Sequence, residues 1–169
     1  MGEIGLEEFL AARSAALLRV GFALTGDWQR AEDLLQTALV SSYRQWARID
    51  DPEAYVRQVM VRAYLGWRRR RWSGEVPAAH PSAKAGQVDQ PDQAHLAVEL
   101  RGAVMGALSM LPARQRAVIV LRYYLDLSEE ATAHMLNVSR GTVKSQASKG
   151  LTTLRASAPL IALYEEEPR

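Results

Sequence analysis

Apolar residues recur at three- and four-residue steps along most of this chain, which is the spacing of one face of an α-helix. In the N-terminal part the pattern predicts helices over residues 3–26, 27–49 and 52–72. We expect Asp27 and Asp51 to cap the second and third of these helices, because each aspartate stands just before a helical pattern begins. The buried stripe of the second helix is predicted to be Ala31, Leu34, Leu35, Ala38, Leu39, Tyr43 and Trp46.

The same periodicity returns at His95 and continues to the C-terminal part. It predicts helices over residues 95–111, 112–124, 128–136 and 140–155. We find no alternation of apolar and polar residues of the kind that marks a strand, and no internal repeat. The predicted fold class is therefore all-α.

Between the two periodic parts, residues 73–94 change in character. Proline and glycine interrupt any period there, and large aliphatic residues nearly vanish. Such a composition is typical of a flexible linker. We therefore expect two small helical domains, residues 1–72 and residues 95–160, joined by this linker and followed by an acidic tail over residues 161–169.

The composition fits a protein that folds around a core without cysteine chemistry. Of 169 residues, 48% are hydrophobic and none is cysteine, which excludes disulfides, thiolate metal sites and cysteine nucleophiles. No stretch approaches the roughly 18 uninterrupted apolar residues of a membrane-spanning helix. The acidic N-terminus lacks the basic start of a signal peptide, so we expect a cytoplasmic location and no membrane partner.

Positive charge is concentrated in two places, although the net charge is only +2. One is the run Arg68–Arg71, and the other is residues 140–155, which contain four cations and no acid. Charge segregated in this way favours a polyanionic partner such as nucleic acid. A solvated helix face and a basic helix end would give the same pattern.

Residues 127–154 have the spacing of a helix-turn-helix, a short helix, a tight turn and a second helix. Asn137 can adopt the left-handed conformation that the turn needs, and Ser139 can cap the second helix. Val143, Leu151 and Leu154 are spaced to pack inward. The outer face could then enter a major groove, and it would present Arg140, Lys144, Ser145, Ser148 and Lys149. The alternative is a helical hairpin with a soluble outer face.

Two sets of motifs resemble the conserved regions of bacterial sigma factors. Arg140-Gly141-Thr142-Val143-Lys144-Ser145 and Lys149-Gly150-Leu151 resemble region 4. Leu24-Thr25-Gly26-Asp27, Ala31-Glu32-Asp33-Leu34-Leu35-Gln36 and Pro52-Glu53-Ala54-Tyr55-Val56-Arg57 resemble region 2. Their order, with a linker between them, is similar to the two-domain extracytoplasmic-function (ECF) sigma factors, most of all their actinobacterial sigma-E-like branch.

The resemblance implies a function in transcription initiation, with no catalysis, cofactor or metal. Region 2 of such proteins docks on the clamp of the largest subunit of core RNA polymerase and opens the −10 promoter element. Region 4 docks on the flap of the second subunit and reads the −35 element. Many relatives are held inactive by an anti-sigma factor between the two domains, which the linker permits.

The resemblance also assigns residues to three surfaces. The core polymerase surface consists of Glu32, Asp33, Leu34 and Gln36. The −10 DNA surface consists of Arg57, Arg62, Tyr64, Trp67, Arg68 and Arg69, in which the arginines could follow phosphates and the aromatic rings could stack on bases. The −35 DNA surface consists of Arg122, Arg140 and Lys144 as phosphate contacts and Ser145, Ser148 and Lys149 as base readers.

Some of these residues also fit a structural role. Tyr64 and Trp67 belong to the apolar stripe of their helix, and Arg122 precedes the helix-turn-helix. The sequence departs from the family pattern at Arg62, where asparagine is usual, and at Gln146, where arginine is frequent. The promoter sequence is therefore not predicted.

Two other classes of function compete with this interpretation. A stand-alone helix-turn-helix regulator would explain residues 95–160 but would leave residues 1–72 unassigned. An enzyme lacks support, because His80, His95 and His134 do not have metal-ligand spacing and no phosphate-binding loop is present. Adjacent acid pairs such as Glu129-Glu130 point apart on a helix and suit capping better than catalysis.

Overall fold

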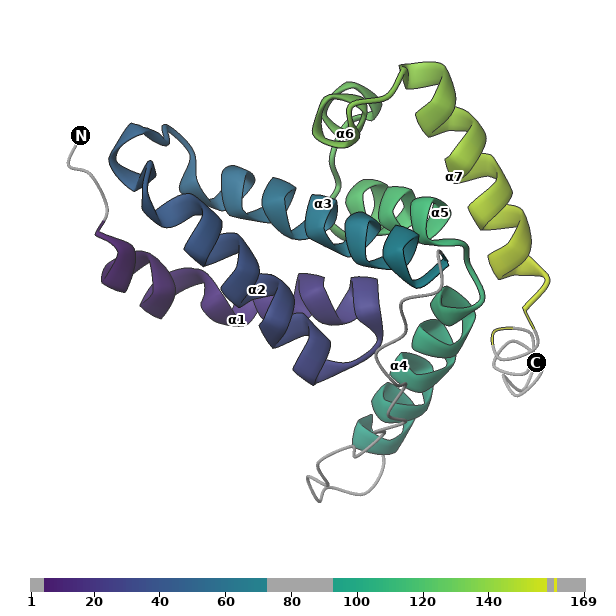
Figure 1. The fold of residues 1–169 in the computed structure, drawn as a ribbon. Coiled ribbons are helices and arrows are strands. Elements are labelled where there is room, and N and C mark those ends of the chain that lie inside the picture. Colours follow the sequence, from purple (N-terminus) through teal and green to yellow (C-terminus); the bar gives the residue numbers. More distant parts are fainter. Residues whose placement is uncertain (1–4, 73–92, 158–159, 161–169) are drawn as a thin grey trace. The chain divides into compact units, whose positions relative to one another are not determined.

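The computed structural model describes residues 5–72, 93–157 and 160, and all regular secondary structure in these ranges is helical (Figure 1). The helices fall into two compact units. The first unit contains α1 (Leu6–Thr25), α2 (Trp28–Tyr43), the short 3₁₀ helix η1 (Trp46–Arg48) and α3 (Pro52–Trp72). The second contains α4 (Gln93–Ser109), α5 (Ala113–Ile119), the π-helical segment η2 (Val120–Tyr124), the first part of α6 (Glu129–Leu136) and α7 (Arg140–Arg155).

The predicted all-α class is confirmed. Most of the predicted linker (residues 73–92) and the predicted acidic tail (residues 161–169) lie outside the described residues. Within the described ranges, no single helix is long and apolar enough to span a membrane, and α1 and α2 have the required length and hydropathy only together, as a pair bent by 120°.

Local sequence signals start and stop the helices of the first unit. The Asp27 carboxylate accepts a hydrogen bond from the Arg30 amide at 2.9 Å, and the Asp51 carboxylate accepts one from the Ala54 amide at 3.0 Å. Gly26 closes α1 in the left-handed conformation, with φ 75°, and its amide donates to the Phe22 carbonyl. Both predicted aspartate caps are therefore confirmed.

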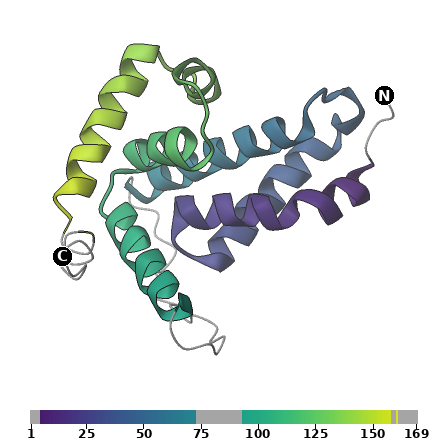
Figure 2. The ribbon, with the colours of Figure 1, turned by 180° about the vertical axis from the view of Figure 1, so that it is seen from behind.

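Helices α1, α2 and α3 lie side by side in the first unit and bury one apolar face each (Figures 1 and 2). Leu17 and Leu24 on α1, Leu34 on α2 and Met60 on α3 are at most 1% exposed. Burying a side chain of this size contributes about 1.5–3 kcal/mol each. Their packing fixes which face of α2 and of α3 remains on the surface.

The second helix ends earlier than the pattern predicted, and Tyr43 does not face the core. Helix α2 stops at Tyr43, whose side chain is 68% exposed, while the neighbouring Ser42 is fully buried. The buried stripe continues from Ala38 to Ser42 at the helical step of four, and Tyr43 lies one residue off it. Trp46 instead packs its ring edge-on against Phe9 from the 3₁₀ helix, with the centroids 4.9 Å apart.

In the second unit, α7 packs against α5. Leu108, Leu111 and Ile119 form a buried cluster, and the half-buried Leu151 and Leu154 of α7 pack on it. Gly150 is also buried, and a Cβ built there would lie 2.9 Å from Cγ1 of Ile119. The glycine allows α7 to approach α5 closely, and Val143 is fully buried as predicted.

The helix-turn-helix closes through its predicted local contacts. Asn137 has φ 53°, and the Ser139 hydroxyl accepts a hydrogen bond from the Thr142 amide at 3.1 Å. The Ser128 hydroxyl accepts one from the Ala131 amide at 3.0 Å at the start of α6. The π-helical turn of η2 was not predicted. A π-turn shifts the side-chain register relative to an α-helix, and Tyr123 and Tyr124 at its end are 55% and 53% exposed.

Candidate nucleic-acid interface

The outward face of α7 is cationic and polar. All five residues predicted for it are exposed, namely Arg140, Lys144, Ser145, Ser148 and Lys149. Val143, Ala147 and Gly150 face inward, so the core fixes the rotation of the helix. Helix α7 carries no acidic residue. A helix with long cations and short hydroxyls on one face suits a major groove, where cations reach phosphates and guanine edges.

An acid from α6 lies against this face, which the sequence did not reveal. Oε2 of Glu129 lies 3.7 Å from Nη2 of Arg140 and 3.7 Å from Nζ of Lys144. Sequence reasoning assigned Glu129 to capping, because it stands in the first turn of α6. The turn of the helix-turn-helix brings it to residues eleven and fifteen positions further along the chain.

Arg122 has contacts of its own within the second unit. Its Nη1 donates a hydrogen bond to the Leu127 carbonyl, and its guanidinium lies 5.9 Å from the centroid of the Tyr123 ring. It also lines a hollow of about 260 Å³ with Glu129 and Lys144. Arg122 therefore braces the chain just before α6, next to the cations of α7.

The polymerase surface predicted on α2 divides into exposed and buried residues. Glu32, Asp33 and Gln36 are exposed, whereas Leu34 is fully buried. The predicted assignment of Leu34 to this surface is corrected, because the Leu34 side chain packs in the core of the first unit. On the outer side of α2, Val40 is 75% exposed and Tyr43 is 68% exposed. Helical spacing from Asp33 and Gln36 would have pointed to both.

On α3, Arg62, Arg68 and Arg69 are exposed and Trp67 is half-buried. Tyr64 is only 4% exposed, so its ring packs in the core and offers no face to a base. The apolar stripe of α3 thus explains Tyr64, and its assignment to the −10 surface is corrected.

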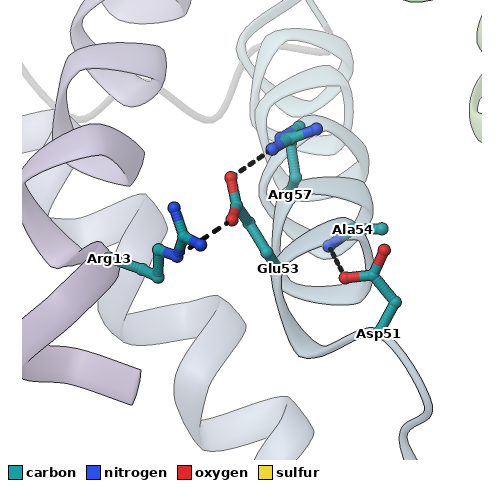
Figure 3. A network of polar contacts seen from close by, with 5 residues as sticks. All are labelled: Arg13, Asp51, Glu53, Ala54 and Arg57. Atoms are coloured by element: carbon teal, nitrogen blue, oxygen red, sulfur yellow. Dashed lines mark hydrogen bonds and ion pairs between the residues drawn. The ribbon is translucent and has the colours of Figure 1, made fainter. Parts of the chain in front are cut away.

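Arg57 belongs to an ion-pair network between α1 and α3 (Figure 3). Its Nη2 lies 2.5 Å from Oε1 of Glu53, and Oε2 of Glu53 lies 3.3 Å from Nε of Arg13. The Arg57 side chain is only 15% exposed. Since its guanidinium is engaged and largely covered, the structure favours a role of Arg57 in the packing of the first unit, and its DNA role stays a prediction.

Replacing Arg57 with alanine should lower the free energy of unfolding by about 1–2 kcal/mol, because it removes a charged hydrogen bond and the packing of a mostly buried stem. Urea unfolding of the full chain, followed by circular dichroism, measures this loss. Arg62→Ala is the control, since its exposed side chain should change stability by less than about 0.5 kcal/mol. Unchanged stability in Arg57→Ala, with impaired promoter opening, would support the predicted DNA role instead.

The family models that match the chain are Sigma-70 region 2, over residues 10–74, and Sigma-70, region 4, over residues 101–154. The chain is 38% identical over 159 residues to the RNA polymerase sigma-E factor of Streptomyces coelicolor, covering 92% of this chain and 87% of that protein. It is 30% identical to the ECF RNA polymerase sigma factor SigL of Mycobacterium tuberculosis, covering 84% of this chain and 82% of that protein.

Among solved structures, the fold is similar to that of the sigma factor RpoE from Bartonella quintana, determined in complex with the anti-sigma factor NepR. The TM-score is 0.63 at 22% identity, over 96% of this chain and 98% of that chain.

These similarities cover both units. The chain belongs to the ECF subfamily of RNA polymerase sigma factors, and its function is promoter recognition in transcription initiation. The resemblance seen in the sequence motifs is confirmed at the level of the subfamily.

Proposed function

We propose that the chain acts by binding alone, without catalysis, and that it directs core RNA polymerase to promoters in the cytoplasm. The observation that carries this proposal is the exposed cationic face of α7, a helix that carries no acidic residue of its own. The buried residues Val143, Ala147 and Gly150 hold this face outward on a helix-turn-helix. A face of this kind suits duplex DNA, since each cation can neutralise a phosphate.

The −35 element is the proposed target of α7. Ser145, Ser148 and Lys149 would contact base edges, because short hydroxyls allow close approach and a lysine reaches guanine. Arg140 and Lys144, with Arg122 beside them, would contact phosphates and set the register of the helix on the duplex.

The −10 element is the proposed target of the exposed side of α3. Arg62, Arg68 and Arg69 are exposed and could follow the backbone of an open strand. Trp67 is half-buried, so part of its ring remains available for stacking on a base. We keep the predicted division into residues 1–72, a linker over 73–94 and residues 95–160 as part of this proposal.

Core RNA polymerase is the proposed partner of α2, through the clamp of its largest subunit. The exposed Glu32, Asp33 and Gln36 offer acidic and polar groups to a basic surface, with Val40 and Tyr43 as apolar neighbours. We propose that the second unit docks on the flap of the second subunit. An anti-sigma factor, the partner named for the similar RpoE structure, is a further proposed partner.

The decisive experiment is transcription in vitro with purified core RNA polymerase, the full chain and genomic DNA, followed by mapping of the start sites. We expect a defined set of starts with shared −10 and −35 sequences. Starts that do not change when the chain is left out would contradict the proposal. Tight binding of the free chain to a palindrome, with no polymerase association, would favour a stand-alone regulator.

Substitution of Asp33 and Gln36 by alanine together should weaken binding to core polymerase by about 5- to 30-fold, because exposed polar groups at the centre of an interface cost about 1–2 kcal/mol when removed. The affinity of labelled core polymerase for the chain measures this, and the unfolding midpoint should not change. Leu34→Ala is the matched control from the same helix. It should cost about 2–5 kcal/mol of stability through its cavity. Unaltered affinity in the double variant would remove α2 from the polymerase surface.

A further inference from the structure

Glu129 lies where the phosphate-binding cations of the proposed −35 surface converge. It stands in the first turn of α6, and its carboxylate is 3.7 Å from the cations of both Arg140 and Lys144. The Arg140 and Lys144 side chains are 63% and 62% exposed, while that of Glu129 is 29% exposed. One partly covered carboxylate thus faces two solvent-exposed cations of the helix that carries no acid.

These two ion pairs contribute little to folding. Pairs between exposed cations and an acid at this distance contribute about 0–1 kcal/mol, and salt screens them. The amides at the start of α6 already favour an acid in its first turn without any cation. The main effect of Glu129 should therefore be on DNA binding, in which Arg140 and Lys144 would contact phosphates instead of this carboxylate.

The hollow next to α7 shows where the competition would occur. It is lined by Glu129 and Val143 together with the polar or charged residues Arg122, Lys144, Ser148 and Arg155. Three cations and a hydroxyl around one hollow suit a phosphate, but the Glu129 carboxylate occupies the same surroundings. A phosphate that approaches Lys144 there must displace the carboxylate or lie close to its negative charge.

We propose that Glu129 lowers the sequence-independent DNA affinity of the −35 surface, because it competes with DNA phosphates for Arg140 and Lys144. This proposal rests on the proposed function of α7. The phosphate contacts bind every sequence alike, whereas the contacts of Ser145, Ser148 and Lys149 depend on the bases. By weakening the phosphate contacts, Glu129 lowers the affinity for every duplex, so that a duplex without the base contacts is bound only weakly.

The test is binding of the full chain to a fluorescent duplex that carries the −35 element, and to the same duplex with that element scrambled, between about 50 and 200 mM salt. Glu129→Gln should tighten binding to both duplexes by about three- to tenfold. It should also make the salt dependence steeper, by about 0.9 in log–log slope for each phosphate contact recovered.

Glu130→Gln is the matched control, because it makes the same charge change at the next residue. Glu130 is exposed, and the described residues give it no ion pair. It should change the affinity by less than about twofold. In a chain that already carries Arg140→Ala and Lys144→Ala, Glu129→Gln should lose most of its effect, since the cations that it would release are gone.

Four results would overturn the proposal: weaker or unchanged binding by Glu129→Gln, an equal gain in Glu130→Gln, a gain confined to the −35 duplex, or a full gain in the background without the two cations. A failure of the proposed function looks different. In that case neither the parent chain nor any variant would distinguish the −35 duplex from the scrambled one.

Discussion

Replacing Gly21 with valine should destabilise the first unit by about 3 kcal/mol, the scale of overpacking a tight core. Gly21 is buried on α1 where it meets α2. A Cβ built at Gly21 would lie 3.0 Å from both Cα and Cβ of Ala31, and 3.2 Å from the Ala31 carbonyl oxygen. Two of these atoms are backbone, so no rotamer change relieves the contact. Helix α2 would have to move away from α1.

Gly66→Ala provides the matched control for Gly21→Val. Gly66 lies inside α3, and a Cβ there would meet nothing within 4 Å. Since alanine favours a helix interior over glycine, Gly66→Ala should raise stability by about 0.5–1 kcal/mol. Urea unfolding of both full-length variants, followed by circular dichroism, separates the two effects. Equal stability of Gly21→Val and the parent chain would mean that α1 and α2 are not in this close contact in solution.

The two glycine variants also bear on function. Asp33 and Gln36 lie on α2 two and five residues after Ala31, so a shift of α2 moves the proposed polymerase surface. Gly21→Val should therefore bind core polymerase more weakly even where it remains folded, whereas Gly66→Ala should bind normally. Surface substitutions on α2 test contacts, and Gly21→Val tests the placement of the helix that carries them.

Local features were predictable from the sequence because their causes lie within a few residues. The aspartate and serine caps depend on a side chain and an amide three positions away, as with Asp27 and Ser139. The left-handed Asn137 follows from the chemistry of a tight turn. The buried Val143 follows from the helical period. The confirmed all-α class is the sum of such local signals.

The candidate site was harder to predict, because a family motif mixes residues that bind with residues that pack. Leu34 stands in a motif that resembles the family, and the resemblance assigned Tyr64 to the −10 surface, yet helical periodicity already placed both in apolar stripes. Their burial shows that the periodicity was the better guide at these two positions. A motif identifies the segment, and the packing of that segment decides which side chains remain outside.

Contacts between separate helices could not be read from one sequence. Arg57 shares Glu53 with Arg13 of α1, and Glu129 meets two cations across the turn. The Arg57–Glu53 pair is four residues apart within α3, a spacing that a single helix explains. The contact of Arg13 with Glu53 and the contacts of Glu129 instead depend on how two helices cross. The unpredicted contacts changed the interpretation of Arg57 and are the basis for proposing a role of Glu129 at the −35 surface.

Lys149→Ala should change which −35 sequences the holoenzyme uses. Lys149 is exposed on α7, and the buried Gly150 beside it holds this part of the helix against Ile119. The backbone at Lys149 is therefore held in place, and the side chain can reach a base edge from a defined position. Loss of one base contact should cost about 1–3 kcal/mol at the preferred base and much less at the others, which is about a 5- to 150-fold change in preference.

The measurement is transcription by the holoenzyme from a library of promoters that differ only in the −35 element. Lys144→Ala is the control from the same helix, five residues earlier. As a proposed phosphate contact, it should weaken all members of the library alike and reduce the salt dependence. If Lys149→Ala also lowers every member equally, then Lys149 contacts the backbone, and base reading on α7 falls to Ser145 and Ser148. Both substitutions remove one positive charge from the same helix. Only the sequence dependence of the loss therefore distinguishes a residue that contacts bases from one that contacts phosphates.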